Sequence, residues 1–409
     1  MKRTGFNVFW ALFLSGGLMS CHGPNPQPSF KDFLIKSFPK SRDAMSGNVS
    51  MTDYDKDGDL DITFFGSVSE EVNWYEYRND STWRKHMVGY FKDTETGSAS
   101  VDIDNDGFMD LVVGRAWFRN PGILDEEPDM PWEMYFYRGG IDGMKCDMTT
   151  ARLDGDSIRD VVCFSHGKGK LRWFDTESPM NWEHHDMVDS LPPGILPNSI
   201  PHSTGDLNGD GLQDITLSSF WFENPGDKDM TWKRHDLPIE SENSDARSQN
   251  ILQWVTDLND DGNMDIVFAL PSAKPPQLRW AENLRRGKLW KVHRLPLPES
   301  FRTIATMGVI DINEDKAKDI FLGMQVADSR KKNSNSGNGF FLLNHGKSKR
   351  WEVVDAFPQN TYAEWKDTKY GDVDADGDID MVSLVWNVEQ QRYELRFFRN
   401  DLIAYNPEE

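Results

Sequence analysis

The chain has 409 residues, of which 38% are hydrophobic and 12% aromatic, including 15 Trp. This composition is too apolar for a disordered or fibrous protein, and it allows a large folded core. Acidic residues outnumber basic residues by 67 to 45, which gives a formal net charge of -22. That charge would repel a phosphate backbone, so the sequence predicts no nucleic-acid partner.

Residues 1–20 have the features of a secretory signal peptide. Lys2 and Arg3 precede an apolar run at residues 6–14 that is too short for a spanning helix. The segment LMSC at residues 18–21 resembles a bacterial lipobox, and the resemblance implies that Cys21 is lipidated and becomes the mature N-terminus. An ordinary cleaved signal with an incidental cysteine is the alternative. We expect export through the inner membrane and a lipid anchor in the cell envelope, at the outer membrane or cell surface.

Residues 21–29 are predicted to be a tether, because three closely spaced prolines prevent a helix. A single folded domain is predicted over residues 30–409. It begins with FKDFLIKSF at residues 30–38, which has the composition of a strand but no partner nearby in the sequence.

Seven Asp-rich loops recur through the domain, with starts 49 to 61 residues apart. They are DYDKDGDLD (53–61), DIDNDGFMD (102–110), RLDGDSIRD (152–160), DLNGDGLQD (206–214), DLNDDGNMD (257–265), DINEDKAKD (311–319) and DVDADGDID (372–380). We call these the Asp loops and number their positions 1 to 9. A period of this length is typical of repeat architectures.

Each Asp loop is followed by a short β-prone run and then by a second run with aromatic residues before a frequent Asn. A further strand carries Trp-x-x-His in four units, ending at His86, His185, His235 and His293. We interpret these histidines as packing residues or as partners in blade-to-blade hydrogen bonds. Counting the strand before each loop, units one to six have four strands and unit seven has three. Residues 30–38 would complete the last unit and remove its open edge. The sequence therefore predicts an all-β, seven-bladed β-propeller of four-stranded blades, closed by the N-terminal strand.

The repeated D-x-[DN]-x-D-G-x-x-D loop followed by an apolar strand resembles the FG-GAP/VCBS repeats of integrin-α-like propellers, over about residues 30–400. The resemblance supports the same fold and implies calcium binding. It says little about activity.

Side-chain oxygens at loop positions 1, 3, 5 and 9, with Gly at position 6, suit a hard cation, and Ca²⁺ better than Mg²⁺. We predict about five structural Ca²⁺ sites. The predicted ligands are Asp53, Asp55, Asp57, Asp61, Asp102, Asp104, Asp106, Asp110, Asp206, Asn208, Asp210, Asp214, Asp257, Asn259, Asp261, Asp265, Asp372, Asp374, Asp376 and Asp380. The loop at Arg152 lacks the first carboxylate and the Gly, so no metal is expected there. The loop at Asp311, with Lys316 at the Gly position, is left open.

Cys146 and Cys163 lie on neighbouring predicted strands of one unit. In an oxidising compartment they could form a disulfide, or they could be two buried thiols. The sequence leaves both possibilities open.

Candidate catalytic residues are expected on the face opposite the Asp loops, around the central channel. His202 lies four residues before Asp206, where no other unit has His, and His166 lies in a turn of the preceding unit. Arg115 and Tyr362 are expected on the same face. A His or Tyr base beside an Arg that neutralises a carboxylate would suit β-elimination from a uronic acid.

Two functions follow from these observations. The first is a calcium-binding, lipid-anchored module that binds a glycan or a protein without chemistry. The alternative is a carbon–oxygen lyase acting on sugars, either a polysaccharide lyase or a dehydratase. The run WFENPG at residues 221–226 is similar to the propeller of aldos-2-ulose dehydratases. Whether the protein is an enzyme is left open.

Overall fold

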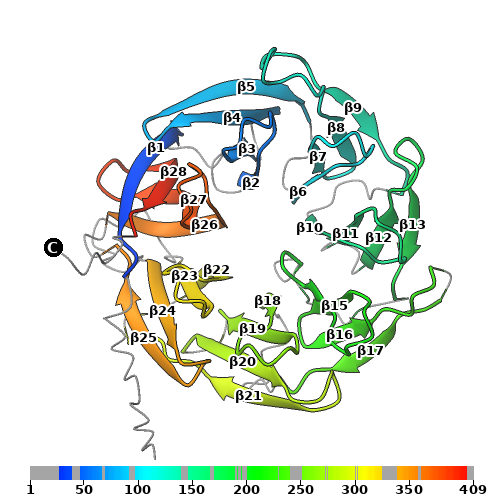
Figure 1. Ribbon diagram of the computed structural model, residues 1–409, viewed down its shortest axis with the longest axis vertical. Helices are drawn as coiled ribbons and strands as arrows, with labels where there is room; N and C mark the ends of the chain where they lie inside the picture. Colours follow the sequence, from blue (N-terminus) through cyan, green and yellow to red (C-terminus); the bar gives the residue numbers. More distant parts are fainter. Residues whose placement is uncertain are drawn as a thin grey trace, which may run out of the picture.

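Seven antiparallel sheets of four strands each make up the described part of the chain, and they surround a central axis as blades (Figure 1). The computed structural model describes residues 27–38, 47–66, 70–91, 97–139, 146–165, 170–188, 191, 195, 200–228, 230–239, 251–271, 273, 275–299, 301, 303–324, 339–357 and 361–402. No helix in these residues has the length and hydropathy of a membrane span. The predicted seven-bladed all-β propeller is confirmed.

The strands of each blade follow one another from the central axis outward. Blades 1 to 3 consist of β2 (Gly47–Thr52), β3 (Asp61–Gly66), β4 (Glu71–Asn79) and β5 (Thr82–Tyr90); β6 (Ser98–Val101), β7 (Asp110–Val113), β8 (Ala116–Arg119) and β9 (Glu133–Phe136); and β10 (Cys146–Ala151), β11 (Asp160–Ser165), β12 (Lys170–Asp175) and β13 (Glu183–Asp186). Blades 4 to 6 consist of β14 (Thr204–Gly205), β15 (Asp214–Leu217), β16 (Phe220–Glu223) and β17 (Lys233–Asp236); β18 (Leu252–Thr256), β19 (Asp265–Leu270), β20 (Gln277–Asn283) and β21 (Trp290–Arg294); and β22 (Ile304–Ile310), β23 (Asp319–Met324), β24 (Gly339–His345) and β25 (Arg350–Asp355). Blade 7 has β26 (Tyr362–Gly371), β27 (Asp380–Asn387) and β28 (Arg392–Asn400), and its outer strand is β1 (Phe30–Ser37).

Blade 7 joins the two ends of the described chain. β1 lies beside β28 (Figure 1) and pairs with it antiparallel. Phe33 lies opposite Phe397 in that ladder. Phe30 also stacks on Phe341 of blade 6, with ring centroids 5.6 Å apart. The predicted closure by residues 30–38 is therefore confirmed, and it removes the free edge that a three-stranded blade would expose.

The apolar core consists of seven clusters, each shared by two neighbouring blades. Between blades 1 and 2, for example, Tyr54 and Trp74 pack with Phe118. The cluster between blades 7 and 1 includes Phe64 and Leu395, so the series continues around the ring. Because each blade buries apolar surface against both neighbours, we infer that the blades stabilise one another.

The Asp at position 9 of every Asp loop is a buried hydrogen-bond acceptor at the start of the second strand. These residues are Asp61, Asp110, Asp160, Asp214, Asp265, Asp319 and Asp380, and none is more than 2% exposed. In each, Oδ2 accepts the backbone N–H of loop position 2 at 2.9 to 3.3 Å. In six of them, Oδ1 accepts a backbone N–H from the third strand or from the residue directly after it, at 2.7 to 3.1 Å. One carboxylate thus joins the loop to two strands.

The Asn that follows the aromatic run links neighbouring blades. Nδ2 of Asn120, Asn224, Asn283 and Asn400 donates to the carbonyl at loop position 2 of the preceding blade, at 2.8 to 3.0 Å. In blade 6, Ser348 Oγ donates to the equivalent carbonyl, that of Leu258, at 3.1 Å. Leu60 N–H in blade 1 donates to Val373 O of blade 7 at 3.0 Å, so the ring closure also has such a bond.

Two groups of predictions concern residues that the structure does not describe. Residues 1–26 lie outside the described chain, so the signal peptide, the lipidation of Cys21 and most of the tether stay predictions. Cys163 is buried and lies opposite Met148 in the β10–β11 ladder. The side chain of Cys146 lies outside the described residues, so its pairing with Cys163 also stays a prediction.

Replacing Asn283 by Ala is expected to lower the free energy of unfolding by about 1–3 kcal/mol, because buried carbonyl groups would lose their donor. Asn283 Nδ2 donates to Leu207 O at 2.8 Å and to Met264 O at 3.0 Å. Asn181→Ala is the matched control, since Asn181 is exposed. Urea unfolding of both variants measures the effect, and equal stabilities would contradict the role given to this amide.

Candidate functional site

The Asp loops connect the first strand of each blade to the second and therefore all lie on one face of the disc. In the first loop Asp53 receives two backbone N–H groups, from Lys56 at 2.6 Å and from Gly58 at 3.2 Å. Gly58 has φ of 105°, in the region that favours glycine. Lys316, at the same position of the sixth loop, has φ of 74°, so that loop keeps the turn without glycine.

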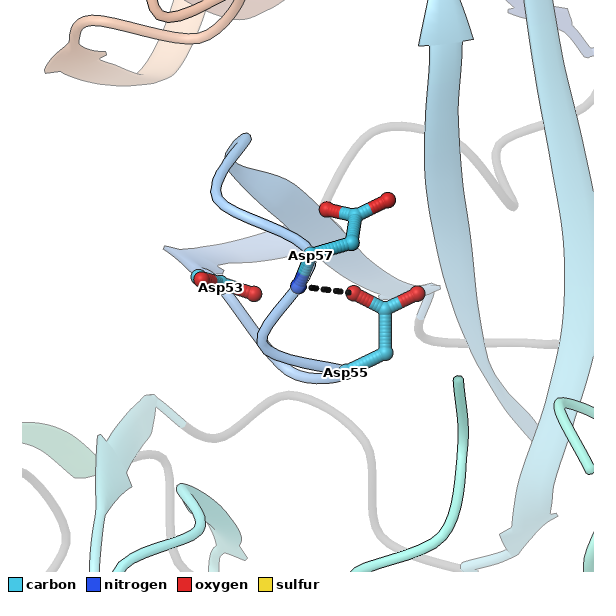
Figure 2. A group of neighbouring side chains, drawn as sticks. All are labelled: Asp53, Asp55 and Asp57. Atoms are coloured by element: carbon cyan, nitrogen blue, oxygen red, sulfur yellow. Dashed lines mark hydrogen bonds between the residues drawn. The ribbon is translucent and has the colours of Figure 1, made fainter. Parts of the chain in front are cut away.

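Acidic side chains converge in four of the loops. Ligand atoms lie within 4.8 Å of one another in the groups Asp53, Asp55 and Asp57; Asp102, Asp104 and Asp110; Asp154, Asp160 and Asp175; and Asp372, Asp374 and Asp380. Figure 2 shows the first group, with the Asp57 backbone N–H donating to Asp55 Oδ1 at 3.3 Å. Such convergence places carboxylates close enough to repel one another unless a proton or a cation separates them.

The pKa values of these carboxyl groups show the cost of that convergence. Burial, followed by the charge of Asp57, raises the pKa of Asp55 to about 7. Burial raises the pKa of Asp61 to about 9 and that of Asp380 to about 8. A bound cation would favour the ionised forms.

Several loop oxygens are buried without a hydrogen-bond donor in the described chain, as expected of atoms that could hold a cation. They are Oδ1 of Asp59, Asp104, Asp372 and Asp378. Asp59 and Asp378 occupy loop position 7, which the sequence pattern predicts to contribute a backbone carbonyl. The donor set of carboxylate oxygens suits a hard cation such as Ca²⁺.

The third strand contributes a residue to the loops that sequence reasoning missed. Asp175 of β12 joins the group in blade 3 and offsets the missing carboxylate at Arg152, whose Nε donates to Ser157 O of its own loop at 3.0 Å. In blade 2 the equivalent residue is Arg119, whose guanidinium forms ion pairs with Asp104 and Asp106. This contribution could have been found from the sequence, because the residue just before the repeated Asn is charged in several units.

The four recurrent histidines are part of the blades themselves. Each ring stacks on a Trp of the third strand, as His235 does on Trp221 with centroids 4.1 Å apart. The other three pairs are Trp74 with His86, Trp173 with His185 and Trp280 with His293. His235 Nε2 also lies 2.7 Å from Glu223, and His293 Nε2 lies 2.7 Å from Glu282. This geometry is consistent with packing.

A cavity of about 180 Å³ lies in the central channel. Its polar and aromatic lining, which we call the channel pocket, consists of Asp147, His202, Gln253, Trp254, Asp367 and Lys369, together with Asn48, Thr306 and Thr368. All nine lie on the innermost strand of a blade or within two residues of it, three to five residues before its Asp loop. Six different blades thus contribute to one site.

His202 is held in the channel pocket by its neighbour in blade 5. Its imidazole stacks on Trp254 with centroids 3.5 Å apart and an interplanar angle of 11°. His202 O accepts the N–H of Val255 at 2.9 Å, and the His202 backbone is left-handed with φ of 60°. Desolvation and the charge of Lys369 lower the pKa of His202. Because His202 is exposed in the channel, we expect its pKa to be lowered less than that of an imidazole enclosed by protein.

Two carboxylates and one ammonium group face the same pocket. Asp367 Oδ1 lies 2.6 Å from Lys369 Nζ, and Asp367 Oδ2 accepts the N–H of Val49 at 2.6 Å. Asp367 has φ of 46° and lies at an irregular part of the β26–β27 ladder. Strained residues and bulges of this kind are frequent at functional sites. Burial and the charge of Asp367 raise the pKa of the half-buried Asp147 to about 6.

The other predicted catalytic residues do not line the channel pocket. Arg115 lies over the ring of Phe136 in blade 2, 5.4 Å from its centroid. Tyr362 is buried in blade 7, and its hydroxyl donates to Asp32 of β1. His166 lies outside the described residues. His202 is therefore the one described member of the four that the structure places in the pocket, and Asp147, Gln253, Trp254, Asp367 and Lys369 were not singled out from the sequence.

The seven-bladed ring with repeated acidic loops defines a repeat β-propeller. Residues 53–113, which contain the first two Asp loops, match the family described as FG-GAP-like repeat. The chain is therefore a seven-bladed β-propeller that contains FG-GAP-like repeat sequence at residues 53–113. It matches no protein of curated function.

Several solved structures resemble the chain at low identity. They include the Tc holotoxin pore of Photorhabdus luminescens (15% identity, 86% of this chain and 16% of that chain, TM-score 0.39), the NanB sialidase of Streptococcus pneumoniae (12%, 90% and 70%, TM-score 0.41) and the Aleuria aurantia lectin (11%, 77% and 96%, TM-score 0.41). The chain thus spans about one sixth of the toxin chain. These likenesses are too distant to bear on its function.

Proposed function

We propose that this propeller is a calcium-binding module that binds a glycan in its channel pocket. The observation that carries the proposal is the pocket itself, where Trp254 and His202 present a ring stack beside Asp147 and Gln253. Stacked rings with a few fixed polar groups are the usual elements of a small-ligand site. With about 180 Å³, the cavity is smaller than the roughly 300–1,000 Å³ of pockets for drug-sized ligands. It suits one sugar ring.

Calcium has a structural role in this proposal. The buried loop oxygens without donors and the converging carboxylates support it. Asp53, Asp55 and Asp57 would hold the ion in blade 1, with Asp59 supplying the buried oxygen at position 7. The ion would neutralise their repulsion and fix the connection between first and second strands.

A sugar lyase is the second candidate, and His202 favours it. Its lowered pKa favours the neutral imidazole, which can accept a proton from a substrate carbon. Arg115 and Tyr362 lie outside the pocket, so the elimination expected from the sequence would need a cation other than Arg115. Lys369 lines the pocket and could take that role.

We also propose that the propeller is anchored in the cell envelope through lipidated Cys21. β1 begins at Phe30, nine residues later, so an extended tether spans at most roughly 30 Å. The anchor would then hold the disc close to the membrane at blade 7.

Removing calcium from the mature protein is expected to lower its melting temperature. The reason is that a ligand that binds the folded state stabilises it by about 2.7 kcal/mol when the free ligand concentration is 100 times the dissociation constant. Calorimetric titration of the chelated protein should show fewer sites in the double variant Asp53→Asn, Asp57→Asn. Asp125→Asn, which changes an exposed carboxylate outside the loops, is the control. A melting temperature that changes neither with chelator nor with added calcium would contradict the proposal.

Binding and chemistry can be separated with one panel of neutral, amino and uronate oligosaccharides. We expect binding that Trp254→Ala weakens by about tenfold or more, as is typical of lost aromatic contacts. Ultraviolet absorbance and product masses test the lyase on the same panel, with His202→Ala beside the exposed control His184→Ala. An unsaturated product lost only in His202→Ala would establish the enzyme, whereas unaltered sugars would leave a binding module.

Expression of the full chain with a labelled fatty acid tests the anchor. We expect label in the wild-type protein and none in Cys21→Ser, because the acyl chains attach through that cysteine. Unlabelled protein whose N-terminus begins elsewhere would show an ordinary cleaved signal.

A further inference from the structure

The channel pocket contains a buried hydrogen-bond acceptor that has no donor within the described part of the chain. Gln253 is 3% exposed and its Nε2 donates to Ser218 O at 2.6 Å, which fixes the orientation of the amide. Gln253 Oε1 is then left buried with no donor in the described chain. A buried acceptor without a partner costs free energy that a ligand donor can recover.

The charges in the pocket also favour a ligand that donates hydrogen bonds. The ammonium of Lys369 is already paired with Asp367, whose second oxygen accepts the Val49 N–H. The side chain of Asp147 has no hydrogen bond or ion pair within the part of the chain that the structure describes. The charge of Lys369 acts on this carboxylate and partly offsets the rise in its pKa that burial causes, but the carboxylate has no direct cationic partner, inside a chain whose formal net charge is -22.

We propose that the channel pocket binds an amino sugar through its protonated primary amine, which Asp147 and Gln253 Oε1 receive while the sugar ring lies against Trp254 and His202. An ammonium group brings three donors and one positive charge, which matches one free carboxylate and one free amide oxygen. The aromatic wall favours an organic cation over a bare metal ion. An anionic uronate would meet Asp147 and Asp367 and be repelled.

This inference rests on the proposed glycan-binding function and adds the charge of the ligand to it. The test compares oligomers of glucosamine, N-acetylglucosamine and galacturonate of equal length, by calorimetric titration of the calcium-loaded mature protein at neutral pH. The glucosamine oligomer is expected to bind about 10- to 100-fold more tightly than the acetylated one, the range that hydrogen bonds to charged groups give. The galacturonate oligomer is expected to bind more weakly than both.

Two variants change the affinity for glucosamine oligomer in opposite directions. Asp147→Asn keeps the side-chain size and removes the charge, so it should weaken binding about 10- to 100-fold and abolish the preference over the acetylated sugar. Lys369→Gln removes the competing cation and should tighten binding. Asp125→Asn is the control, and melting curves confirm that each variant is folded.

The outcomes separate this inference from the function it rests on. Equal binding of both sugars, unchanged in Asp147→Asn, would overturn the amine but keep the glycan site. Absence of binding by every sugar would overturn both. Displacement of glucosamine oligomer by CaCl₂, beyond the effect of ionic strength, would show a metal-ion site in place of the amine site.

Discussion

The buried carboxylate at position 9 of each Asp loop is the interaction on which the rest of the propeller depends. It begins the second strand, receives the backbone of its own loop on one oxygen and, in six blades, accepts on the other a backbone N–H of the third strand or of the residue directly after it. Without it, buried N–H groups would lose their acceptor in the middle of the blade. The Asn that follows the aromatic run then connects its blade to the preceding one by donating to the carbonyl at loop position 2. Local turn, blade and ring are therefore connected through a few polar atoms.

This arrangement explains why acidic residues accumulate on one face. The position 9 carboxylates accept backbone N–H groups, and in blades 2 and 7 the carboxylates at positions 1 and 3 gather beside them. Burial raises the pKa of several of these groups, so the loops hold their negative charge at a cost unless a cation is bound. Blade 2 meets part of that cost with Arg119, a cation from its own third strand. The repeat thus tolerates different ways of balancing the same charge.

The central channel differs from the loops because its residues do not repeat. Among the residues that the structure describes, thirteen other than glycine have positive φ, and many of them occupy turn positions shared by several blades, such as Lys56, Asn105 and Asp260 at loop position 4. His202 and Asp367 belong to no such shared turn, and both face the channel pocket. Every blade thus has the same backbone framework, and single residues on or next to the inner strands give the channel a lining that differs from blade to blade. That asymmetry is the strongest physical argument that the pocket has a function.

The fold was predictable from the sequence because the repeat carries local information seven times. Each Asp loop, β-prone run and aromatic run specifies one blade, and the unmatched strand at residues 30–38 specified the closure that β1 and β28 now show. His202 stood out because a unique residue on a repeated scaffold is visible without a structure. Asp147, Gln253 and Lys369 did not stand out, since they lie in different blades up to 222 residues apart and only ring closure brings them to one axis. Arg115 and Tyr362 had suitable chemistry, yet packing against Phe136 and bonding to Asp32 keep them in their own blades. The sequence by itself determined the strand order and the acidic loops, because these depend on near neighbours in the chain. Only the tertiary structure decided which side chains share the channel pocket, because that depends on the radius and closure of the whole ring.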